Sequence, residues 1–406
     1  MLVKDVKTIT NYVLLCCSLL FASARATEWT IETVDSTETG LYSSLRIDKD
    51  GNAHVTYVVG GQNELRYAFW DHLQKKWFTM PVDINASFCS LTLDSKQRPH
   101  ISYAEAGTAS GSRLRYARWD GSKWSKEAIP LDSDIIGFYT SIALDTADRP
   151  NISFYEYRGR KGTDLHIRLR VVSWTGQYWE VRTVDGSEGS GKYNSMAADA
   201  AGQLRLAYAN VHALTPGARM ATWNGKEWRL EIVDDRTSSN GDTVGVSMAM
   251  ALDKGGAPHL CYRDTNAMLM KYAMLSNGRW VTEMVDSLVT APPFTDRNSI
   301  TVDDAGRPYI SYYDGRSGEL RLAHKEGVRW LIEVVDSGFA GLTSSIQLGR
   351  GVIWVSYGDE TNHLLKVARR TIETPVSNGR DGNSATSTPA QATEPKQLGL
   401  QHEKQH

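Results

Sequence analysis

The chain lacks several features that would assign it to a familiar functional class. Its 406 residues carry 45 basic and 47 acidic side chains, so the basic excess of a nucleic-acid-binding protein is missing. No P-loop, zinc-ligand spacing or nucleophile elbow occurs, and no segment has the apolar period of a helix. We therefore expect an all-β protein with no cofactor, no metal ion and no nucleic-acid partner.

Long apolar runs and cysteines are also scarce. The run YVLLCCSLLF, Tyr12 to Phe21, is shorter than the roughly 20 residues that span a bilayer. Two lysines precede it and Ala-Arg-Ala follows it, a pattern that predicts a signal peptide over residues 1–26. We expect a secreted or periplasmic protein with no membrane insertion after signal cleavage. Of four cysteines only Cys89 and Cys261 then remain, and we interpret them as separate buried residues.

A unit of about 50 residues repeats seven times between residues 27 and 374. Each copy is marked by a tryptophan, and six of the seven carry Val-Asp five residues later, as in WTIETVD. The markers are Trp29, Trp77, Trp124, Trp179, Trp228, Trp280 and Trp330. We interpret these indoles as packing elements between neighbouring units. Residues 375–406 lack apolar periodicity and are expected to form a disordered C-terminal tail.

Each unit carries four short strand signals, which is the content of a propeller blade. In the first unit they are SLRID, AHVTY, LRYAFW and the following tryptophan strand. Three strands follow Trp330 without a further tryptophan strand, so the strand at Trp29 must complete the last blade. The prediction is a seven-bladed β-propeller of four-stranded antiparallel blades, closed by its N-terminal strand, which leaves no exposed sheet edge between the ends.

The two faces of such a ring should differ. One, the repeated-turn face, carries nearly identical D-x-x-G-x-P and Gly-x-x-Trp turns. The other, the variable-loop face, carries loops of unequal length, which are enlarged in units two to six. Because irregular loops on a rigid frame are the usual location of function, we expect the site on the variable-loop face.

Two side-chain rings approach that face but recur in every unit. The second strands end in Tyr57, Tyr103, Phe154, Tyr208, Tyr262, Tyr312 and Tyr357. The third strands carry Arg66, Arg115, Arg170, Arg219, Lys271, Arg321 and Lys366. Because a ligand occupies one pocket and not seven, we interpret both rings as structural, with each cation paired to the glutamate of a tryptophan strand.

Departures from the repeat are the better candidates for a site. The candidate ligand-binding residues are Tyr157, Arg158, Arg160, His212, Arg263, Asp264, Arg297, Asp314 and Arg316. Asp314 and Arg316 belong to the segment YDGRSG, which is expected to be exposed on the variable-loop face.

The unit D-x-x-G-x-P-x-I-S-Y…L-R-x-A…G-x-x-W resembles the repeats of exported bacterial propellers of the sialidase-like, Asp-box-related superfamily, over residues 29–370. An Asp box reads S-x-D-x-G-x-x-W. The segment ARWDGSKW keeps the Gly-x-x-Trp end, with Ala117 and Trp119 where serine and aspartate belong. Every unit offers an arginine or lysine at one position, so no sialidase arginine triad is assigned. The resemblance implies the fold and leaves the activity open.

Two functions remain open. The first is recognition of a glycan or protein partner through the variable-loop face, without catalysis. The second follows from the resemblance, because some seven-bladed propellers are polysaccharide lyases that use tyrosine or histidine as base and acid and a cation to neutralise a uronate carboxylate. The residues of the matching types are Tyr155, Tyr157, His166, Arg168 and His212. We favour binding, because no motif fixes the geometry of this set.

Overall fold

The computed structural model describes most of the chain between residues 28 and 372. The described ranges are 28–38, 40–108, 111–131, 138–158, 166–211, 216–235, 244–287, 289–290 and 297–372, and within them the side chains of 106–108, 111–112, 157–158 and 166 are not described. The predicted signal peptide and C-terminal tail lie outside these ranges. Within them, no helix is long and apolar enough to cross a membrane.

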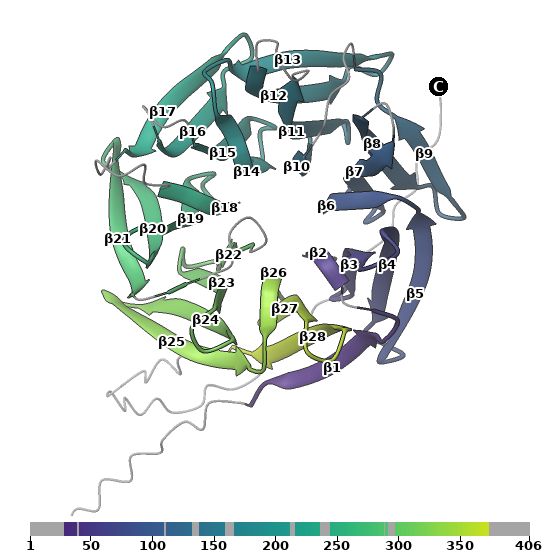
Figure 1. Ribbon diagram of the computed structural model, residues 1–406, viewed down its shortest axis with the longest axis vertical. Coiled ribbons are helices and arrows are strands. Elements are labelled where there is room, and N and C mark those ends of the chain that lie inside the picture. Colours follow the sequence, from purple (N-terminus) through teal and green to yellow (C-terminus); the bar gives the residue numbers. More distant parts are fainter. Residues whose placement is uncertain are drawn as a thin grey trace, which may run out of the picture. The chain divides into compact units, whose positions relative to one another are not determined.

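The described residues form seven four-stranded antiparallel sheets around a common centre (Figure 1). Blades one to three are β2 (Gly40–Ile47), β3 (Ala53–Val59), β4 (Glu64–Asp71), β5 (Lys76–Asp83); β6 (Ala86–Leu93), β7 (Pro99–Thr108), β8 (Gly111–Trp119), β9 (Trp124–Ala128); and β10 (Phe138–Leu144), β11 (Pro150–Arg158), β12 (His166–Trp174), β13 (Trp179–Asp185). Blades four and five are β14 (Ser190–Ala198), β15 (Leu204–Asn210), β16 (Gly217–Trp223), β17 (Trp228–Asp234); and β18 (Val244–Leu252), β19 (Pro258–Asp264), β20 (Leu269–Ser276), β21 (Arg279–Ser287). Blade six is β22 (Ser299–Val302), β23 (Pro308–Asp314), β24 (Glu319–Glu326), β25 (Arg329–Asp336).

The ring closes through the N-terminal strand, as the repeat count predicts. The seventh sheet has the order β1-β28-β27-β26, built from β1 (Thr30–Asp35), β26 (Ala340–Gly349), β27 (Val352–Asp359) and β28 (Leu364–Thr371). β1 pairs antiparallel with β28, with Thr30 opposite Arg369, and the two strands lie side by side in Figure 1. The first and last parts of the propeller are thereby joined by backbone hydrogen bonds.

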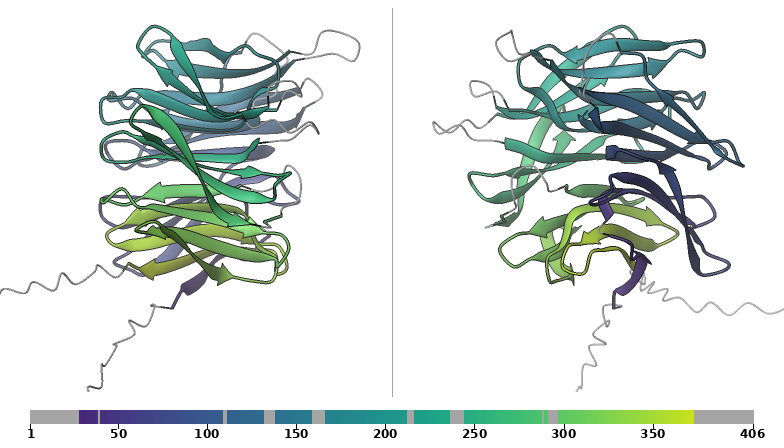
Figure 2. Two further views of the ribbon diagram at one scale, coloured as in Figure 1. Left: turned by 90° about the vertical axis from the view of Figure 1, so that its left-hand side faces the viewer. Right: turned by 45° about the vertical axis from the view of Figure 1, so that its right-hand side comes forward.

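The apolar core lies between adjacent blades. Every residue of β3, β19 and β23 is buried, because these second strands are covered by a neighbouring blade on each face. Figure 2 shows the strands crossing the thickness of the ring, which places successive turns on opposite faces. The outer strands, such as β5, are exposed or partly buried along most of their length. The continuous burial of the second strands therefore reflects packing on both sides.

The tryptophans that open the outer strands pack between blades, which confirms their predicted role. The Trp330 ring meets the edge of Tyr272 in the preceding blade, with centroids 5.2 Å apart. Its indole Nε1 donates a hydrogen bond of 3.0 Å to Glu283 of that blade. The same bond joins Trp77 to Glu32 and Trp280 to Glu231, each at 3.1 Å.

The tyrosine and cation rings are structural too, but their partner differs from the expected glutamate. The Tyr312 hydroxyl donates to Asp286 of the preceding blade at 2.7 Å, and Arg321 lies 3.1 Å from the same carboxylate. We call this arrangement the Asp–Tyr–cation clasp. It recurs at Asp35 with Tyr57 and Arg66, Asp83 with Tyr103 and Arg115, Asp234 with Tyr262 and Lys271, and Asp336 with Tyr357 and Lys366.

The expectation that these cations pair with glutamate is wrong because of register. On β24, Arg321 lies opposite Tyr312 of β23 and opposite Val334 of β25. Its position is therefore close to the end of the outer strand that carries the Val-Asp pair. Glu283 instead faces Lys325, four positions further along the third strand, at 2.7 Å. The aspartate and the glutamate of one outer strand therefore bind different cations, as Asp286 and Glu283 do, and as Asp336 and Glu333 do with Lys366 and Arg370.

The clasp predicts a specific dependence of stability on pH. Burial raises the pKa of Asp35, but hydrogen bonds from Thr37 and Tyr57 and the charge of Arg66 outweigh it, and the pKa lies below 3.8. Burial likewise raises the pKa of Asp83, and bonds from Tyr103 and Lys126 lower it further than burial raises it. A pKa that is lower in the folded state gives stability that is present above about pH 4 and is lost as the pH falls below it.

We expect Tyr57→Phe to lower the free energy of unfolding by about 1 kcal/mol at neutral pH, because one buried hydrogen bond to a carboxylate is lost. The difference from wild type should shrink as the pH falls from the unfolded pKa of Asp35 through its lower folded pKa, because the native carboxylate then becomes protonated. Urea unfolding of the two proteins at pH 7 and pH 3 measures it. Tyr178→Phe, at a ring that is 60% exposed, is the control. A difference that is constant with pH would contradict this account.

A second repeated contact lines the centre of the ring. Six serines of the innermost segments, here called the serine belt, are Ser44, Ser90, Ser141, Ser195, Ser299 and Ser345. Each Oγ accepts the backbone N–H of the next blade's innermost strand, from Leu91, Ile142, Met196, Met250, Ile346 and Leu45, at 3.0 to 3.3 Å. Ala249 occupies the seventh position. The belt thus joins neighbouring blades at their inner edges.

Candidate functional site

A pocket of about 170 Å³ lies at the centre of the ring and is lined by innermost segments of all seven blades. We call it the axial pocket. Its wall includes the serine belt, Arg46 and Arg297, and among the described residues that line it there is no carboxylate. Because each belt Oγ already accepts a backbone N–H, its own O–H remains to donate, and no described residue accepts it. The wall therefore offers mainly hydrogen-bond donors and positive charge.

The backbone of the innermost strands bulges just before the belt. The pairing register shifts between Leu41 and Ser44 in β2, and at the equivalent places in β6, β10, β14 and β18. The residue two positions before the belt position has a positive φ in five successive blades: Tyr42 53°, Phe88 50°, Tyr139 54°, Tyr193 50° and Ser247 54°. Bulky side chains rarely adopt this conformation, and bulges that re-aim a side chain often mark functional positions.

These four rings form a continuous group, here called the aromatic arc. Centroids are 4.5 Å apart for Tyr42 and Phe88, 4.9 Å for Phe88 and Tyr139, and 4.9 Å for Tyr139 and Tyr193. The arc covers blades one to four, toward the variable-loop face where these strands begin. In the other three blades the equivalent residues are Ser247, Arg297 and Thr343. One side of the pocket mouth is thus aromatic and the other is polar.

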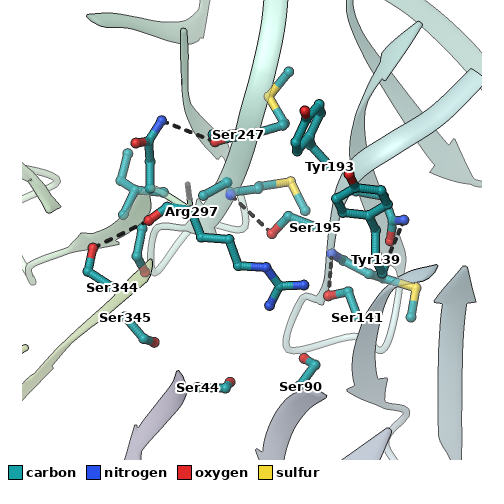
Figure 3. A pocket seen from close by; sticks show the side chains of 18 of the residues that line it. Ser44, Ser90, Tyr139, Ser141, Tyr193, Ser195, Ser247, Arg297, Ser344 and Ser345 are labelled. Atoms are coloured by element: carbon teal, nitrogen blue, oxygen red, sulfur yellow. Dashed lines mark hydrogen bonds between the residues drawn. The ribbon is translucent and has the colours of Figure 1, made fainter. Parts of the chain in front are cut away.

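Arg297 extends from the polar side into the pocket, between Ser44, Ser90, Ser141 and Ser195 (Figure 3). Its guanidinium lies 5.4 Å from the centroid of Tyr42 and 5.9 Å from that of Phe88. It donates one hydrogen bond, of 3.3 Å, to the carbonyl of Cys89.

Within the described ranges the charge of Arg297 has no counter-ion. Arg297 forms no ion pair with a described residue, and enclosure by protein lowers its pKa from 12.5, although the residue stays partly exposed. At neutral pH the positive charge of the Arg297 guanidinium is poorly compensated by the described residues. The negative charge of an anionic ligand would compensate it.

Arg46 supplies a second positive charge deeper in the same pocket. Arg46 lies two positions after the belt serine of its blade, Ser44, whereas Arg297 lies two positions before the belt serine of its blade, Ser299. Relative to the belt, the two arginines therefore differ by four residues, or about 13 Å along a strand. Arg46 donates to the carbonyl of Leu45 at 2.8 Å, and burial lowers its pKa to about 10. It also forms no ion pair with a described residue. The pocket is therefore electropositive along its length.

The structure brings one of the sequence-predicted residues into this pocket and another close to it. Arg297 is in its wall, and Tyr155 is buried behind the arc, with its centroid 6.2 Å from that of Tyr139. Arg168 lies on β12, the third strand of its blade, opposite Glu156 and away from the centre. The interpretation of Arg297 as a ligand-binding residue is therefore compatible with its position, whereas Arg168 has no place in the pocket.

Other predicted residues have structural positions. Arg263 is 3% exposed and donates to the carbonyl of Tyr313 at 2.5 Å. Asp264 accepts the N–H of Ala267 at 3.1 Å.

The expectation that Asp314 is exposed is wrong. It is fully buried, 3.0 Å from Arg321, and accepts the backbone N–H of Arg316 at 3.1 Å, because it ends β23 and caps the following turn. Arg316 itself is exposed, as expected.

The remaining predicted residues cannot be assembled into a site. Arg160 and His212 lie outside the described residues, and for Tyr157, Arg158 and His166 only the strand backbone is described. Among described residues no group of three metal-ligating side chains occurs. Cys89 and Cys261 are buried and unpaired, as predicted, and burial raises the pKa of the Cys89 thiol to about 12.

Sequence reasoning missed the aromatic arc because it began each innermost strand at the belt serine. A signal was present: an aromatic residue stands two positions before that serine in four successive units, in YSS, FCS, YTS and YNS. The common orientation of these four aromatic rings toward the centre depends on bulges and positive φ values. The repeat pattern of the sequence does not indicate either feature.

No family model and no curated protein matches the chain. Solved structures do. A polysaccharide lyase, the PL25 ulvan lyase bound to -[GlcA(1-4)Rha3S]-, aligns with 84% of this chain and 94% of its own at 13% identity and a TM-score of 0.56. AofleA from Arthrobotrys oligospora aligns with 77% and 91% at 13% identity and 0.51. The Hadza microbial sialidase Hz136 aligns with 79% and 76% at 13% identity and 0.50. At such identities the similarity establishes the fold alone: this seven-bladed propeller is structurally similar to sialidases and polysaccharide lyases.

Proposed function

We propose that the protein is an exported propeller that binds an anionic glycan in its axial pocket, without catalysis. The observation that carries this is the composition of the pocket wall. It has two arginines that form no ion pair with a described residue, a belt of hydroxyl donors, and no carboxylate among the described lining residues. Guanidinium groups bind carboxylate or sulfate oxygens in a fixed planar geometry. In the adjacent aromatic arc, Tyr42 and Phe88 are partly exposed and offer ring surface against which the apolar side of a sugar can pack.

A glycan suits the pocket better than a protein partner. A cavity of about 170 Å³ admits one sugar unit or a terminal group, whereas a stable protein interface buries about 800 Å² on each partner. The ulvan lyase of the same fold was solved with a saccharide bound, which shows that this type of frame can hold one. We therefore place glycan recognition ahead of protein recognition.

Binding without catalysis is favoured by the titration properties of the wall. A general base works best with a pKa near the working pH. The described lining contains neither histidine nor carboxylate. At the mouth of the pocket, burial raises the pKa of Tyr42 above its usual 10. No described group there is suited to remove a proton at neutral pH.

The test uses the full-length mature protein and a panel of uronate-containing, sulfated and neutral polysaccharides. We expect calorimetry to show saturable binding of one or more anionic polymers, and this binding should weaken at high salt. Neutral polymers of matched length should not bind in this pocket. Ultraviolet absorbance from unsaturated ends should not increase. An increase in absorbance would contradict binding without catalysis and support the lyase function. If no anionic polymer bound, the proposal of anionic-glycan binding would be wrong.

A further inference from the structure

A second pocket, of about 280 Å³, lies between the third and fourth blades, on the repeated-turn face. Three indoles line it, those of Trp174, Trp223 and Trp228. Asp145 and Arg149, which flank a D-x-x-G-x-P-type turn, line it as well. It is separate from the axial pocket, with which it shares no lining residue. We call it the inter-blade pocket.

The pocket exists because two large side chains of the repeat are replaced by small ones. In three other blades a histidine of the second strand is hydrogen-bonded to a tyrosine of the third. These pairs are His54 with Tyr67 at 2.6 Å, His100 with Tyr116 at 2.5 Å, and His259 with Tyr272 at 2.6 Å. In the third blade the same positions hold Asn151 and Val171, and both line the pocket. The smaller side chains leave space beside the indoles of Trp223 and Trp228 in the fourth blade.

A third departure removes a hydrogen-bond acceptor from the same place. Where Glu283 accepts the indole N–H of the next blade, the third blade has Arg182, which can only donate. The Nε1 of Trp228 has no acceptor among the described residues, a state that it shares with the Nε1 of Trp29, Trp124 and Trp179. The Oγ of Ser173, a residue that is 9% exposed, has no partner either. Both residues line the pocket, and buried polar groups without partners are uncommon.

The charges around this pocket are balanced, in contrast to the axial pocket. Arg149 binds Asp145 at 2.7 Å, and Arg182 binds Glu180. The Arg182 guanidinium also lies over the Trp223 ring, 5.1 Å from its centroid. Such paired groups can exchange hydrogen bonds with hydroxyls without requiring a net charge on the ligand.

We propose that the inter-blade pocket binds a single neutral sugar ring. Indole faces pack against the apolar side of the ring, and the paired charges, Ser173 and the Trp228 N–H bind its hydroxyls. The site is independent of the proposed function, because it differs in place, charge and lining. A glycan with anionic and neutral units could occupy both pockets only from opposite faces, so each pocket would take a separate chain or chain end.

The test fills the pocket with the residues that the other blades use. Asn151→His/Val171→Tyr restores the hydrogen-bonded pair and should fold at least as well as wild type. Tryptophan fluorescence and calorimetry are followed with D-glucose, D-galactose, D-mannose, L-fucose and L-rhamnose, with D-glucuronate as the charged control. We expect wild type to bind at least one neutral sugar and the filled variant to bind it at least about tenfold more weakly. The filled variant should keep its binding of the anionic polymer.

Two further variants keep the proposal falsifiable. Trp223→Leu should also weaken binding of the neutral sugar, and it tests the pocket if the filled variant does not fold. Arg297→Gln should leave the affinity for the neutral sugar unchanged. The proposal is overturned if no neutral sugar binds to wild type, if both Asn151→His/Val171→Tyr and Trp223→Leu bind as wild type, or if binding is lost only in Arg297→Gln. The last result would place the sugar in the axial pocket.

Discussion

Arg297→Gln is expected to weaken binding of the anionic glycan by about 10- to 100-fold. A hydrogen bond between charged groups contributes about 1.5 to 3 kcal/mol, and each 1.4 kcal/mol is a factor of ten in affinity. The stability of the protein should not fall, because the variant removes a cation that has no counter-ion in the described structure. Calorimetry with one anionic polymer, together with thermal unfolding of the free protein, measures both effects.

Two variants control this result. Arg297→Lys keeps the charge but loses the planar fork, so it should bind between wild type and the glutamine variant. Arg316→Gln removes an exposed charge elsewhere on the variable-loop face and should bind as wild type. If Arg297→Gln bound the polymer with unchanged affinity, or if its loss of binding followed a matching loss of stability, Arg297 would be a structural residue.

Asp234→Asn is expected to lower the free energy of unfolding by about 3 to 5 kcal/mol. Asp234 and Lys271 form the most enclosed of the clasps, with side chains 3% and 5% exposed, and the Tyr262 hydroxyl donates to the same carboxylate at 2.8 Å. Removal of the negative charge leaves the Lys271 ammonium buried. Asp264 lies 3.9 Å from that ammonium, too far for a hydrogen bond that would replace the lost one. Urea unfolding monitored by circular dichroism measures the loss.

The matched control is Asp336→Asn in the clasp of the sixth and seventh blades. There Lys366 also binds Asp359 at 2.6 Å, so its charge keeps a partner and the loss should be smaller. Replacement of both partners, Asp234→Leu/Lys271→Met, should recover much of the stability, because an apolar pair of similar size avoids burying a charge. Equal losses in Asp234→Asn and Asp336→Asn would show that the clasps do not act through the charge of the cation.

The clasps also show where a repeated pattern supports a correct conclusion and where it fails. The recurrence of Tyr312 and Arg321 equivalents in nearly every unit was sufficient to interpret them as structural. Their partner was mistaken, because the choice between Asp286 and Glu283 depends on which part of the preceding blade's outer strand faces the cation. The third blade, with Phe154 for tyrosine and Arg170 bound to Glu156 at 3.3 Å, shows that one ring position tolerates loss of the hydroxyl.

The sequence by itself determined the frame: four strands in each unit, seven blades, and closure by the strand at Trp29. It did so because each blade must pack on the next, and the residues that make this contact recur every 47 to 55 positions. Only the tertiary structure decided the candidate sites. The axial pocket gathers a few residues from each of seven blades and aims them by bulges, so Tyr42 and Arg297 meet across 255 positions. The inter-blade pocket arises from side chains missing on one blade and indoles of the next, whose proximity only the folded ring creates.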